Sequence, residues 1–253
     1  MAMDKLIFTA MNTVNNIYDN RSVRAQNMAN ISVPGYRRDL GTKPSGSAFL
    51  NVMNGFQSRA FALKNDGNIF ETTPGQLSQT NEAMDIAIRG SGYFFIKGNG
   101  DVSLTRRGDL SVDNDGFLVN GASARLLDAE LNPIAIPAYR SITFSSNGDI
   151  IIEPVGAEAG TRVKVGQLAT TSADGVALKK FPDGEIRAPN GKIPEIDQIP
   201  RVLQHNVELS NVNITDELVN SIQDQRQYEI NIKLISTAQE LDEGSSSLMR
   251  LPN

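Results

Sequence analysis

Two short segments of the sequence have the residue types of a ligand-binding loop. Gly90-Ser91-Gly92 is glycine-rich, but a dinucleotide-binding loop also needs a third glycine and a helix directly after it. The β-type run Tyr93-Phe94-Phe95-Ile96 follows instead. Asp113-Asn114-Asp115-Gly116 resembles the opening of a calcium loop, yet Ala124 stands where an EF-hand requires a glutamate at the twelfth position. We therefore predict a tight corner between strands at the first segment and a hairpin turn at the second.

The other reactive side chains are isolated in the sequence. His205 is the single histidine, the chain has no cysteine, and the nucleophile motif Gly-x-Ser-x-Gly does not occur. Neighbouring carboxylates fall on predicted turns or on one helix face, where solvated charge explains them. The basic pairs Arg106-Arg107 and Lys179-Lys180 are interpreted as isolated pairs that need no phosphate. The sequence thus predicts a surface or interface role for His205, no catalytic, metal-binding or cofactor-binding residues, no cofactor, and no enzymatic activity.

Composition narrows the class of protein further. The 253 residues carry 24 lysines and arginines against 29 aspartates and glutamates, a net charge of −5, which argues against a nucleic-acid partner. No apolar run approaches the ~18 residues of a membrane-spanning helix, so we expect no direct membrane insertion. The N-terminal stretch MAMDKLIFTAMN lacks the apolar core of a secretory signal, so we expect no cleaved signal peptide.

The elements that must position these side chains divide the chain into a middle and two ends. All nine Asn-Gly and Asp-Gly dipeptides lie between residues 54 and 191, and such pairs favour the turns that join antiparallel strands. Short β-type runs separate them, namely Tyr93–Ile96, Asp109–Val112, Phe117–Val119, Ser141–Phe144 and Asp149–Ile152. The sequence predicts a central antiparallel β domain over residues 72–202.

The N-terminal end has helical periodicity. A 4-3 spacing of apolar residues begins at Met3 and continues through Arg21 and Arg24, and Pro34-Gly35 is a firm stop. Asparagine is a poor helix former, and six asparagines lie in the first thirty residues. We therefore expect this helix to gain most of its stability from packing against partners, with packing onto the β domain of a single monomer as the alternative.

The C-terminal end has a comparable apolar stripe. A helix is predicted to begin at Asn213 or Thr215, with acidic residues in its first turn, and Gly244 with the three serines after it is expected to weaken or end it. Residues 1–45 carry six basic and three acidic residues, a net of +3, whereas residues 201–253 carry four and eight, a net of −4. Opposite signs are expected if the two ends pack against each other or against other copies.

The predicted fold class is α+β, with four segments in chain order. They are an N-terminal helix at 1–35, a connecting loop or extended arm at 36–71, the β domain at 72–202, and a C-terminal strand or loop with a long helix at 203–253.

Four ordered segments resemble the signatures of bacterial flagellar axial proteins, the rod and hook subunits. The first runs from Asn27-Met28-Ala29-Asn30 to Pro34-Gly35-Tyr36-Arg37-Arg38 and is similar to the family pattern "Asn-Leu-Ala-Asn … Gly-aromatic-basic". The second runs from Thr73-Pro74-Gly75 to Gly92-Tyr93-Phe94. The third is Thr105-Arg106-Arg107-Gly108 with Asp115-Gly116-Phe117-Leu118-Val119 after it. The fourth is Val207-Glu208-Leu209-Ser210-Asn211-Val212-Asn213, followed by Gln225-Arg226-Gln227-Tyr228-Glu229.

The resemblance implies a structural subunit of the flagellar basal-body rod. Both terminal helices would form the inner, coiled-coil-like layer of a tubular rod that transmits motor torque through the periplasm, and the β domain would face outward. Expected partners are other copies of the chain, other proximal and distal rod subunits, the surrounding ring proteins, and the type III export apparatus during secretion. The short length and Phe8-Thr9-Ala10-Met11 favour a proximal rod subunit over a distal rod or hook-type subunit.

The residues expected at the interface between subunits combine the 4-3 spacing with the polar positions of the signatures. They are Ile7, Val14, Ile17, Arg21, Arg24, Asn27, Met28, Asn30, Ile31, Ser210, Asn211, Leu218, Ile222, Tyr228, Glu229, Ile232 and Ile235. Two other classes of function stay open. A β-rich carbohydrate-binding or adhesin module would need an aromatic platform, although the chain has no tryptophan, and a peptidoglycan hydrolase would need two carboxylates in one cleft.

Overall fold

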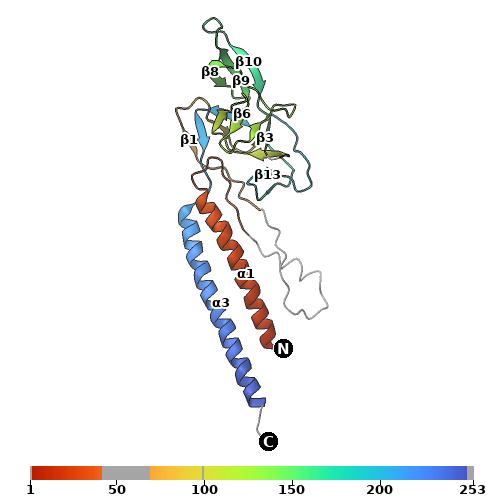
Figure 1. The fold of residues 1–253 in the computed structure, drawn as a ribbon, viewed down its shortest axis with the longest axis vertical. Helices are drawn as coiled ribbons and strands as arrows, with labels where there is room; N and C mark the ends of the chain where they lie inside the picture. Colours follow the sequence, from red (N-terminus) through yellow and green to blue (C-terminus); the bar gives the residue numbers. More distant parts are fainter. Residues whose placement is uncertain (1, 42–68, 99, 250–253) are drawn as a thin grey trace. The chain divides into compact units, whose positions relative to one another are not determined.

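The computed structural model describes residues 2–41, 69–98 and 100–249, which fall into two compact units (Figure 1). Of the described residues, 2–28, 39–41, 69 and 213–249 form the helical unit, and 29–38, 70–98 and 100–212 form the β unit. The fold is α+β, with a central antiparallel β domain between an N-terminal and a C-terminal helix, as the sequence predicts.

Helix α3, Ile214–Met249, begins where the sequence places its start. The side-chain oxygen of Asn213 accepts hydrogen bonds from the backbone N–H groups of Thr215 and Asp216 at 2.9 and 3.4 Å, so Asn213 caps the helix. The helix continues through Gly244 to Met249, although the sequence predicted weakening or an end there. One glycine costs about 1 kcal/mol in a helix interior, which is too little to stop a helix that is otherwise continuous.

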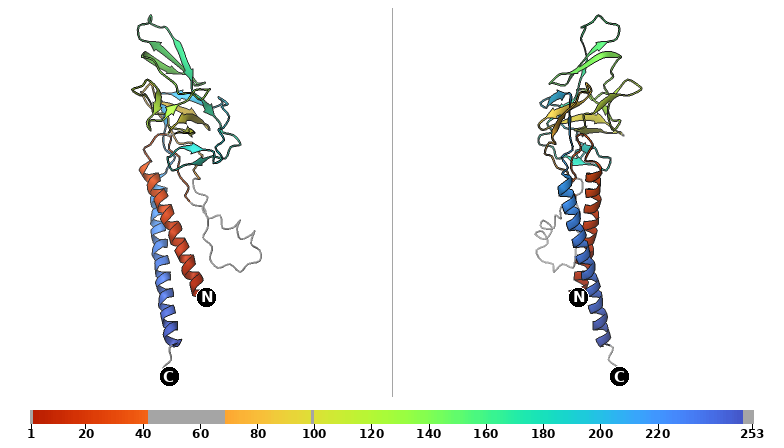
Figure 2. Two further views of the ribbon diagram at one scale, coloured as in Figure 1. Left: turned by 45° about the vertical axis from the view of Figure 1, so that its right-hand side comes forward. Right: turned by 90° about the vertical axis from the view of Figure 1, so that its left-hand side faces the viewer.

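Helix α1, Ala2–Ala29, ends before the predicted stop at Pro34-Gly35. Backbone hydrogen bonds from Val33 N–H to Asn30 O and from Tyr36 N–H to Val33 O close two consecutive turns after the helix. A residue that precedes proline disfavours the helical conformation, and Gly35 has a φ of 67°, so the chain leaves the helix early. Figure 2 shows α1 and α3 side by side in two further views.

The β unit consists of short strands, most of them joined by tight turns. In chain order they are β1 (Leu77–Gln79), β2 (Ile86–Arg89), β3 (Tyr93–Lys97), β4 (Val102–Thr105), β5 (Leu110–Val112), β6 (Leu118–Asn120), β7 (Arg125–Leu126), β8 (Tyr139–Phe144), β9 (Asp149–Pro154), β10 (Val163–Gln167), β11 (Thr170–Thr171), β12 (Lys179–Lys180), β13 (Ile186–Arg187), β14 (Arg201–Gln204) and β15 (Asn206–Glu208). The predicted Asn-Gly and Asp-Gly turns join β5 to β6, β6 to β7, β8 to β9 and β12 to β13.

All strand pairs of the described residues are antiparallel. The largest sheet has the order β12-β13-β4-β3-β7-β6-β5, with β11 also paired to β3. Strands β8, β9 and β10 form a separate sheet in sequence order, and two small ladders pair β1 with β15 and β2 with β14. These ladders bring the last strands before α3 against the first strands of the domain, so the β unit closes on itself through its two ends.

Strand β3 is buried on both faces. Phe94 and Ile96 pack into one apolar cluster with residues of β2, β6, β8 and β9, whereas Tyr93 and Phe95 pack into a second cluster with Leu104. Because successive side chains of a strand point to opposite faces, a continuous apolar run fits a strand that has a core on each side.

Candidate functional site

The two loop-like segments of the sequence form turns, as predicted. Gly90-Ser91-Gly92 is the corner between β2 and β3, and the Asp113 carboxylate orders the β5–β6 hairpin by accepting N–H bonds from Asp115 and Phe117 at 2.9 and 2.8 Å. His205 is exposed between β14 and β15. Across the described ranges, acidic and histidine side chains do not gather into a group that could hold a metal, and neither helix is long and apolar enough to span a bilayer.

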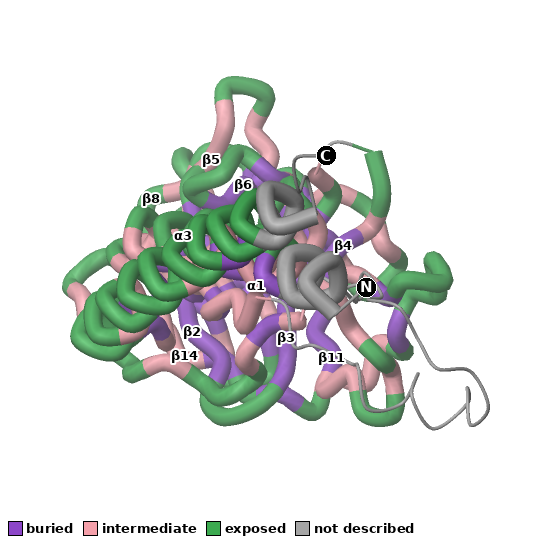
Figure 3. Tube along the Cα trace, turned by 90° about the horizontal axis from the view of Figure 1, so that it is seen from below, coloured by how far each residue is buried: buried purple, intermediate pink, exposed green. Residues whose placement is uncertain are grey.

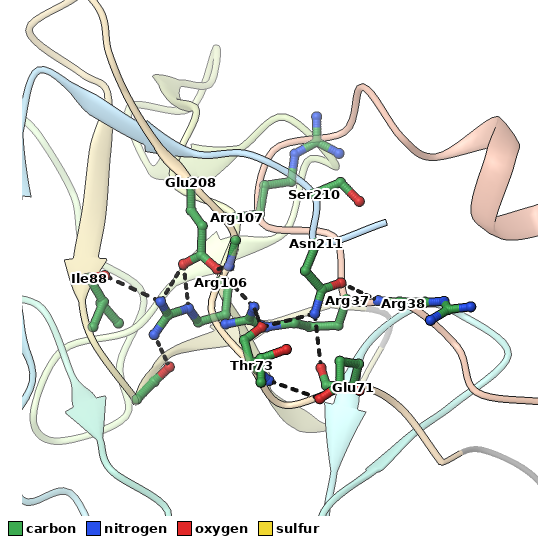
Figure 4. Close-up of polar contacts among 12 residues, drawn as sticks. Arg37, Arg38, Glu71, Thr73, Ile88, Arg106, Arg107, Glu208, Ser210 and Asn211 are labelled. Carbon is green, nitrogen blue, oxygen red and sulfur yellow. Dashed lines mark hydrogen bonds and ion pairs between the residues drawn. The ribbon is translucent and has the colours of Figure 1, made fainter. Parts of the chain in front are cut away.

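A buried polar cluster lies where the sequence signatures meet in the β unit (Figure 4). We call it the junction cluster and define it as Arg37, Arg106, Glu208 and Asn211. One oxygen of Glu208 accepts a bond from Arg37 Nη1 at 2.9 Å, and the other accepts from Arg106 Nε at 2.7 Å and from Arg106 Nη2. The two arginines are 2% exposed and Glu208 is 1% exposed, so water does not screen these charges.

Backbone carbonyls accept further hydrogen bonds from both arginines, whereas the buried Arg37 Nε has no hydrogen-bond partner among the described residues. Arg106 Nη1 donates to Gly92 O at 2.7 Å and Nη2 donates to Ile88 O at 3.2 Å, while Arg37 Nη1 donates to Thr73 O at 2.5 Å. A buried ion pair repays the cost of desolvation only when its geometry is good and its other donors are bonded. The junction cluster meets both conditions at Arg106.

Asn211 connects three segments of the β unit. Its Oδ1 accepts the backbone N–H of Arg38 at 2.7 Å, and its Nδ2 donates to Thr73 O at 2.9 Å and to Glu71 O at 3.2 Å. A carboxamide has both donors and an acceptor, so Asn211 can bond to N–H and C=O groups at once. Aspartate, which lacks the two donors, could not replace these contacts.

Glycines let the backbone approach the junction cluster closely. Gly35 donates its N–H to Glu208 O at 2.7 Å, and a Cβ at Gly35 would lie 2.4 Å from the carbonyl carbon and oxygen of Arg106. Gly75 donates its N–H to Glu208 Oε1 at 2.8 Å, and a Cβ there would lie 1.9 Å from Leu209 O. Side chains at either position would push the signature segments apart.

The interpretation of Arg106-Arg107 and Lys179-Lys180 as isolated basic pairs is wrong. Arg106 is the buried partner of Glu208, and Arg107 pairs with Asp109 at 2.7 Å. Lys180 is also buried, donates to Arg37 O at 2.9 Å and lies 3.6 Å from the centre of the Tyr36 ring. The partners of Arg106 and Lys180 are far away in the chain, so the local sequence could not reveal them, whereas Asp109 is only two residues from Arg107.

The buried charges near Arg37 do not balance. Burial lowers the pKa of the Arg37 guanidinium, Glu208 raises it and Arg106 lowers it further, with a net lowering. Burial raises the pKa of the neighbouring Tyr93 hydroxyl. Arginine stays protonated in proteins, so the cluster holds two guanidinium charges against one carboxylate. Loss of the Glu208 carboxylate would therefore lower the stability of the β unit.

A second polar cluster joins the two helices of the helical unit. We call it the helix clamp and define it as Arg24 and Asn27 of α1 with Glu217 and Asp224 of α3. Arg24 Nε donates to Asp224 at 2.6 Å, and Arg24 Nη1 lies 3.4 Å from Glu217. Asn27 Nδ2 donates to Glu217 at 3.2 Å and to Asp39 O at 2.8 Å, and its Oδ1 accepts from Asp39 N–H at 2.9 Å.

The least exposed side chains of each helix repeat at a spacing of three or four residues. On α1 the buried or part-buried set includes Ala10, Thr13, Ile17, Asn20, Arg24 and Asn27, and on α3 it includes Glu217, Ser221, Asp224, Asn231, Ile235 and Ala238. Most members of these two stripes are small or polar. In contrast, many large apolar side chains of α3 lie outside its stripe, and Figure 3 shows most of this helix as exposed.

The structure distributes the residues that were predicted for the subunit interface over three environments. Ile17 and Asn27 are buried within the chain. Part-buried residues are Val14, Arg24, Met28, Asn30, Ile31, Ser210, Asn211 and Ile235, and exposed residues are Arg21, Leu218, Ile222, Tyr228, Glu229 and Ile232. The side chain of Ile7 lies outside the described residues. The set therefore mixes contacts made within one chain with surface that is free in one chain.

The sequence reasoning missed the residues on which the clusters depend. Glu208 and Arg106 lie inside signature segments but were given no role, and Glu217 and Asp224 were read only as acidic helix residues or not at all. One signal in the sequence indicates Glu208, because this acid stands between apolar residues in a β-type run. A single acid in such a run is expected to need a buried partner.

Comparisons with known proteins agree with the arrangement of these segments. Residues 87–152 match the family model described as flagellar hook protein FlgE/F/G D1 domain, and residues 203–248 match the model described as flagellar basal body rod FlgEFG protein C-terminal. The first match covers the corner after β2 and the Arg106 segment, and the second covers Glu208, Asn211 and most of α3.

Relatives of known name match over most of their length. Flagellar basal-body rod protein FlgF of Escherichia coli (strain K12) is 28% identical over 93% of this chain and 94% of its own. Flagellar basal-body rod protein FlgG of Buchnera aphidicola subsp. Baizongia pistaciae is 30% identical over 88% and 91%. FlgG of Buchnera aphidicola subsp. Acyrthosiphon pisum is 34% identical over 70% and 69%.

Proposed function

Because the chain belongs to the family of flagellar basal-body rod proteins and is most like FlgF, we propose that it is a structural subunit of the proximal rod that assembles through its terminal helices. In this role it transmits motor torque as part of the drive shaft in the periplasm. Its partners are other copies and other rod subunits, with the ring proteins around them. It reaches the rod through the type III export apparatus.

The exposed apolar surface of α3 carries this proposal. Large side chains on the helix are between 42% and 58% exposed in the single chain, namely Ile214, Leu218, Val219, Ile222, Ile230, Ile232, Leu234 and Leu241. Exposed large apolar side chains in this number along one helix mark a site of protein–protein contact. A helix whose inner stripe is polar gains little from folding against α1 alone, so it needs further partners to bury its apolar side chains.

The helix clamp supports the same proposal. Arg24 and Asn27 fix α1 against α3 through contacts that have one geometry, and polar residues in a helix seam set the register at some cost in stability. A helix pair with a defined register presents the same exposed surface in every copy. Repeated contacts between identical surfaces that do not close into a ring produce a helical filament.

The test is a pair of charge insertions on the exposed surface of α3. Leu218→Asp and Ile222→Asp are expected to abolish swimming in a strain that depends on this chain, because each places a carboxylate in the proposed contact. The control is Gln223→Asp on the same helix, which adds the same charge at an exposed position that is already polar and so removes no apolar side chain. Swimming in soft agar and the amount of the chain in isolated basal bodies are measured, with circular dichroism to verify the fold.

Two results would contradict the proposal. Normal swimming of both apolar-to-aspartate variants would show that the surface makes no required contact. Normal amounts of the variants in basal bodies, together with lost swimming, would place the defect after assembly and remove the helices from the assembly step.

A further inference from the structure

The loop between β9 and β10 is an exposed projection with apolar side chains at both ends. Val155 is 65% exposed and Val163 is 43% exposed, and the loop between them contains small residues and two glycines with positive φ. The hairpin that carries it forms one end of the β unit (Figure 1). An isolated exposed valine needs no explanation, but two at the base of one loop form a small apolar surface.

This loop is held in place before it meets any partner. The Glu153 carboxylate accepts the backbone N–H of Gly160 at 3.1 Å, and the same carboxylate pairs with Arg140 at 2.8 Å. Thr161 N–H also donates to Glu158 O at 3.1 Å. The bond from Gly160, as the largest cause, and the bond from Arg140 lower the pKa of Glu153 against the opposing effect of burial. A loop that is already ordered loses less conformational entropy on binding.

A pocket of about 340 Å³ lies in the β unit around β13. Its floor is apolar, with Phe95, Leu104 and Ile186, and its rim includes Ile193, which is 44% exposed. The strand labels in Figure 1 show that β13 and the β8–β9–β10 sheet lie at opposite ends of the β unit. The loop of a chain therefore lies away from the pocket of the same chain.

The free charges of the two surfaces are complementary. Glu158 and Arg162 are exposed on the loop, and Asp101 and Lys192 are exposed at the rim of the pocket. Within the described residues none of the four forms an ion pair, whereas the other rim cation, Arg187, is paired with Asp183 and Glu185. Each free charge on the loop thus has an opposite charge available at the pocket.

We propose that the β9–β10 loop of one copy docks into the β13 pocket of a second copy. The small residues at the tip of the loop cover the apolar floor and the valines at its base pack against Ile193 at the rim, while Glu158 meets Lys192 and Arg162 meets Asp101. The contact joins different surfaces of the two copies, so it is head-to-tail and can repeat along a filament. It rests on the proposed function, because it supplies an outer contact for an assembly whose inner contacts come from the helices.

Cysteine cross-linking tests the contact directly, since the chain has no cysteine of its own. Full-length Val155→Cys and Ile193→Cys chains are assembled separately and as a mixture, then oxidised. A 155–193 disulfide that forms only in the mixture is the expected result. The matched control replaces Ile193→Cys with Thr143→Cys, which is exposed on β8, and no linked product is expected from that mixture.

The outcomes separate this contact from the helical assembly. Sedimentable polymer without a 155–193 disulfide would overturn the docking proposal and leave assembly through the helices intact. Absence of both polymer and disulfide would overturn both. A disulfide between two copies of Val155→Cys, in place of the mixed product, would show a symmetric contact and would also overturn the docking proposal.

Charge reversal provides a second test that does not depend on cysteine chemistry. Glu158→Lys and Lys192→Glu, each introduced alone into both cysteine variants, are expected to reduce the yield of the 155–193 product about threefold to tenfold. The two reversals in the same chain are expected to restore the yield, because each copy then offers the opposite pair. Equal losses in the single and double variants would contradict the proposed pairing.

Discussion

At the scale of single residues, Glu208 bonds to several distant segments of the β unit. Its carboxylate bonds to two buried arginines and to the Gly75 N–H, and its backbone carbonyl accepts the Gly35 N–H. One side chain thereby holds the segment that follows α1 in sequence, the segment that precedes α3, and the turn before β1. A residue with partners in so many segments cannot be exchanged for a neutral one without loss in each of them.

We predict that Glu208→Gln destabilises the β unit by about 3–5 kcal/mol, because two buried guanidinium groups lose their counter-charge. Urea unfolding followed by circular dichroism measures the change. Glu130→Gln is the matched control, since Glu130 is exposed in a turn, and it is expected to stay within about 0.5 kcal/mol of the parent. A loss below about 1 kcal/mol for Glu208→Gln would contradict a structural role for the pair.

A comparison of Gly→Ala at Gly35 and at Gly175 separates two contributions to the loss of stability, namely backbone strain and steric overlap of the new Cβ. Both have positive φ, 67° and 73°, but only at Gly35 would a Cβ meet other atoms. Gly175→Ala is therefore expected to cost about 1–2 kcal/mol from the backbone alone. Gly35→Ala is expected to cost a further ~1–3 kcal/mol because the Arg106 peptide must move. Equal losses in thermal or urea unfolding would show that the Arg106 peptide shifts freely.

At the scale of elements, the helix clamp decides how α1 meets α3. Opposite charge at the two chain ends predicts attraction between them, and the structure gives that attraction a specific contact, Arg24 between Asp224 and Glu217. Both acids are buried at one end of the pair. Because the inner stripes are mostly polar, the contact between the two helices fixes their register and buries little apolar surface.

Arg24→Ala is predicted to loosen the helix pair by about 1–3 kcal/mol, because it removes a cation that contacts two buried carboxylates. Hydrogen exchange of peptides from residues 214–224 measures the loosening as faster exchange. Arg21→Ala on the same helix is the control, since Arg21 is exposed and is expected to leave exchange unchanged. Similar exchange in both variants would argue that the clamp contributes nothing.

The β8–β9–β10 sheet is predicted to lose stability in acid. A hydrogen bond from Lys164, the largest cause, and one from Ser145 lower the pKa of the Asp149 carboxyl against the opposing effect of burial. A carboxyl with a lowered folded-state pKa stabilises the fold above its unfolded pKa, and this stability is lost as the pH falls through the folded-state pKa.

The measurement for this prediction is the urea midpoint as a function of pH. Between about pH 4 and pH 2, the parent is expected to lose stability more steeply than Asp149→Asn, which has no carboxyl to protonate. Asp174→Asn, which alters an exposed aspartate in a turn, is expected to follow the parent. Parallel curves for the parent and Asp149→Asn would rule out this carboxyl as a source of the acid sensitivity.

At the scale of the whole molecule, the two units differ in how they are stabilised. The β unit has two apolar clusters and a buried ionic cluster, whereas the helical unit has small and polar residues in its inner stripes and apolar residues outside. A helix pair of this composition is expected to be marginal in a dilute chain and to become stable when further copies cover its apolar surface.

Hydrogen exchange with mass spectrometry on the dilute full-length chain is predicted to show this difference. Residues 70–212 should be strongly protected, and α1 and α3 should exchange faster by a factor of at least ~10. Assembly should then protect the helices and leave the β unit little changed. Uniform protection in the dilute monomer would mean that the helices are stable without partners, which would favour a self-sufficient monomeric fold.

Sequence alone determined the features that depend on local patterns. Turn dipeptides and short β-type runs located β3, β5, β6, β8 and β9, Asn213 located the start of α3, and the signature segments indicated the family. These features could be predicted because backbone geometry and periodicity act over a few residues. The end of α1 and the continuation of α3 past Gly244 departed from prediction, since single proline and glycine signals compete with neighbouring residues.

Which charged residues meet depends on the tertiary structure. Arg106 and Glu208 are 102 residues apart in the chain, and Arg24 and Asp224 are 200 apart, so no local pattern links them. The positions of the inner stripes also depend on the tertiary structure. In parts of the helices the buried positions are shifted from the predicted 4-3 positions, because the polar side chains of Asn27 and Glu217 face each other. Pairing of this kind depends on how distant strands and helices pack, and that packing brings four separate signatures to one buried carboxylate.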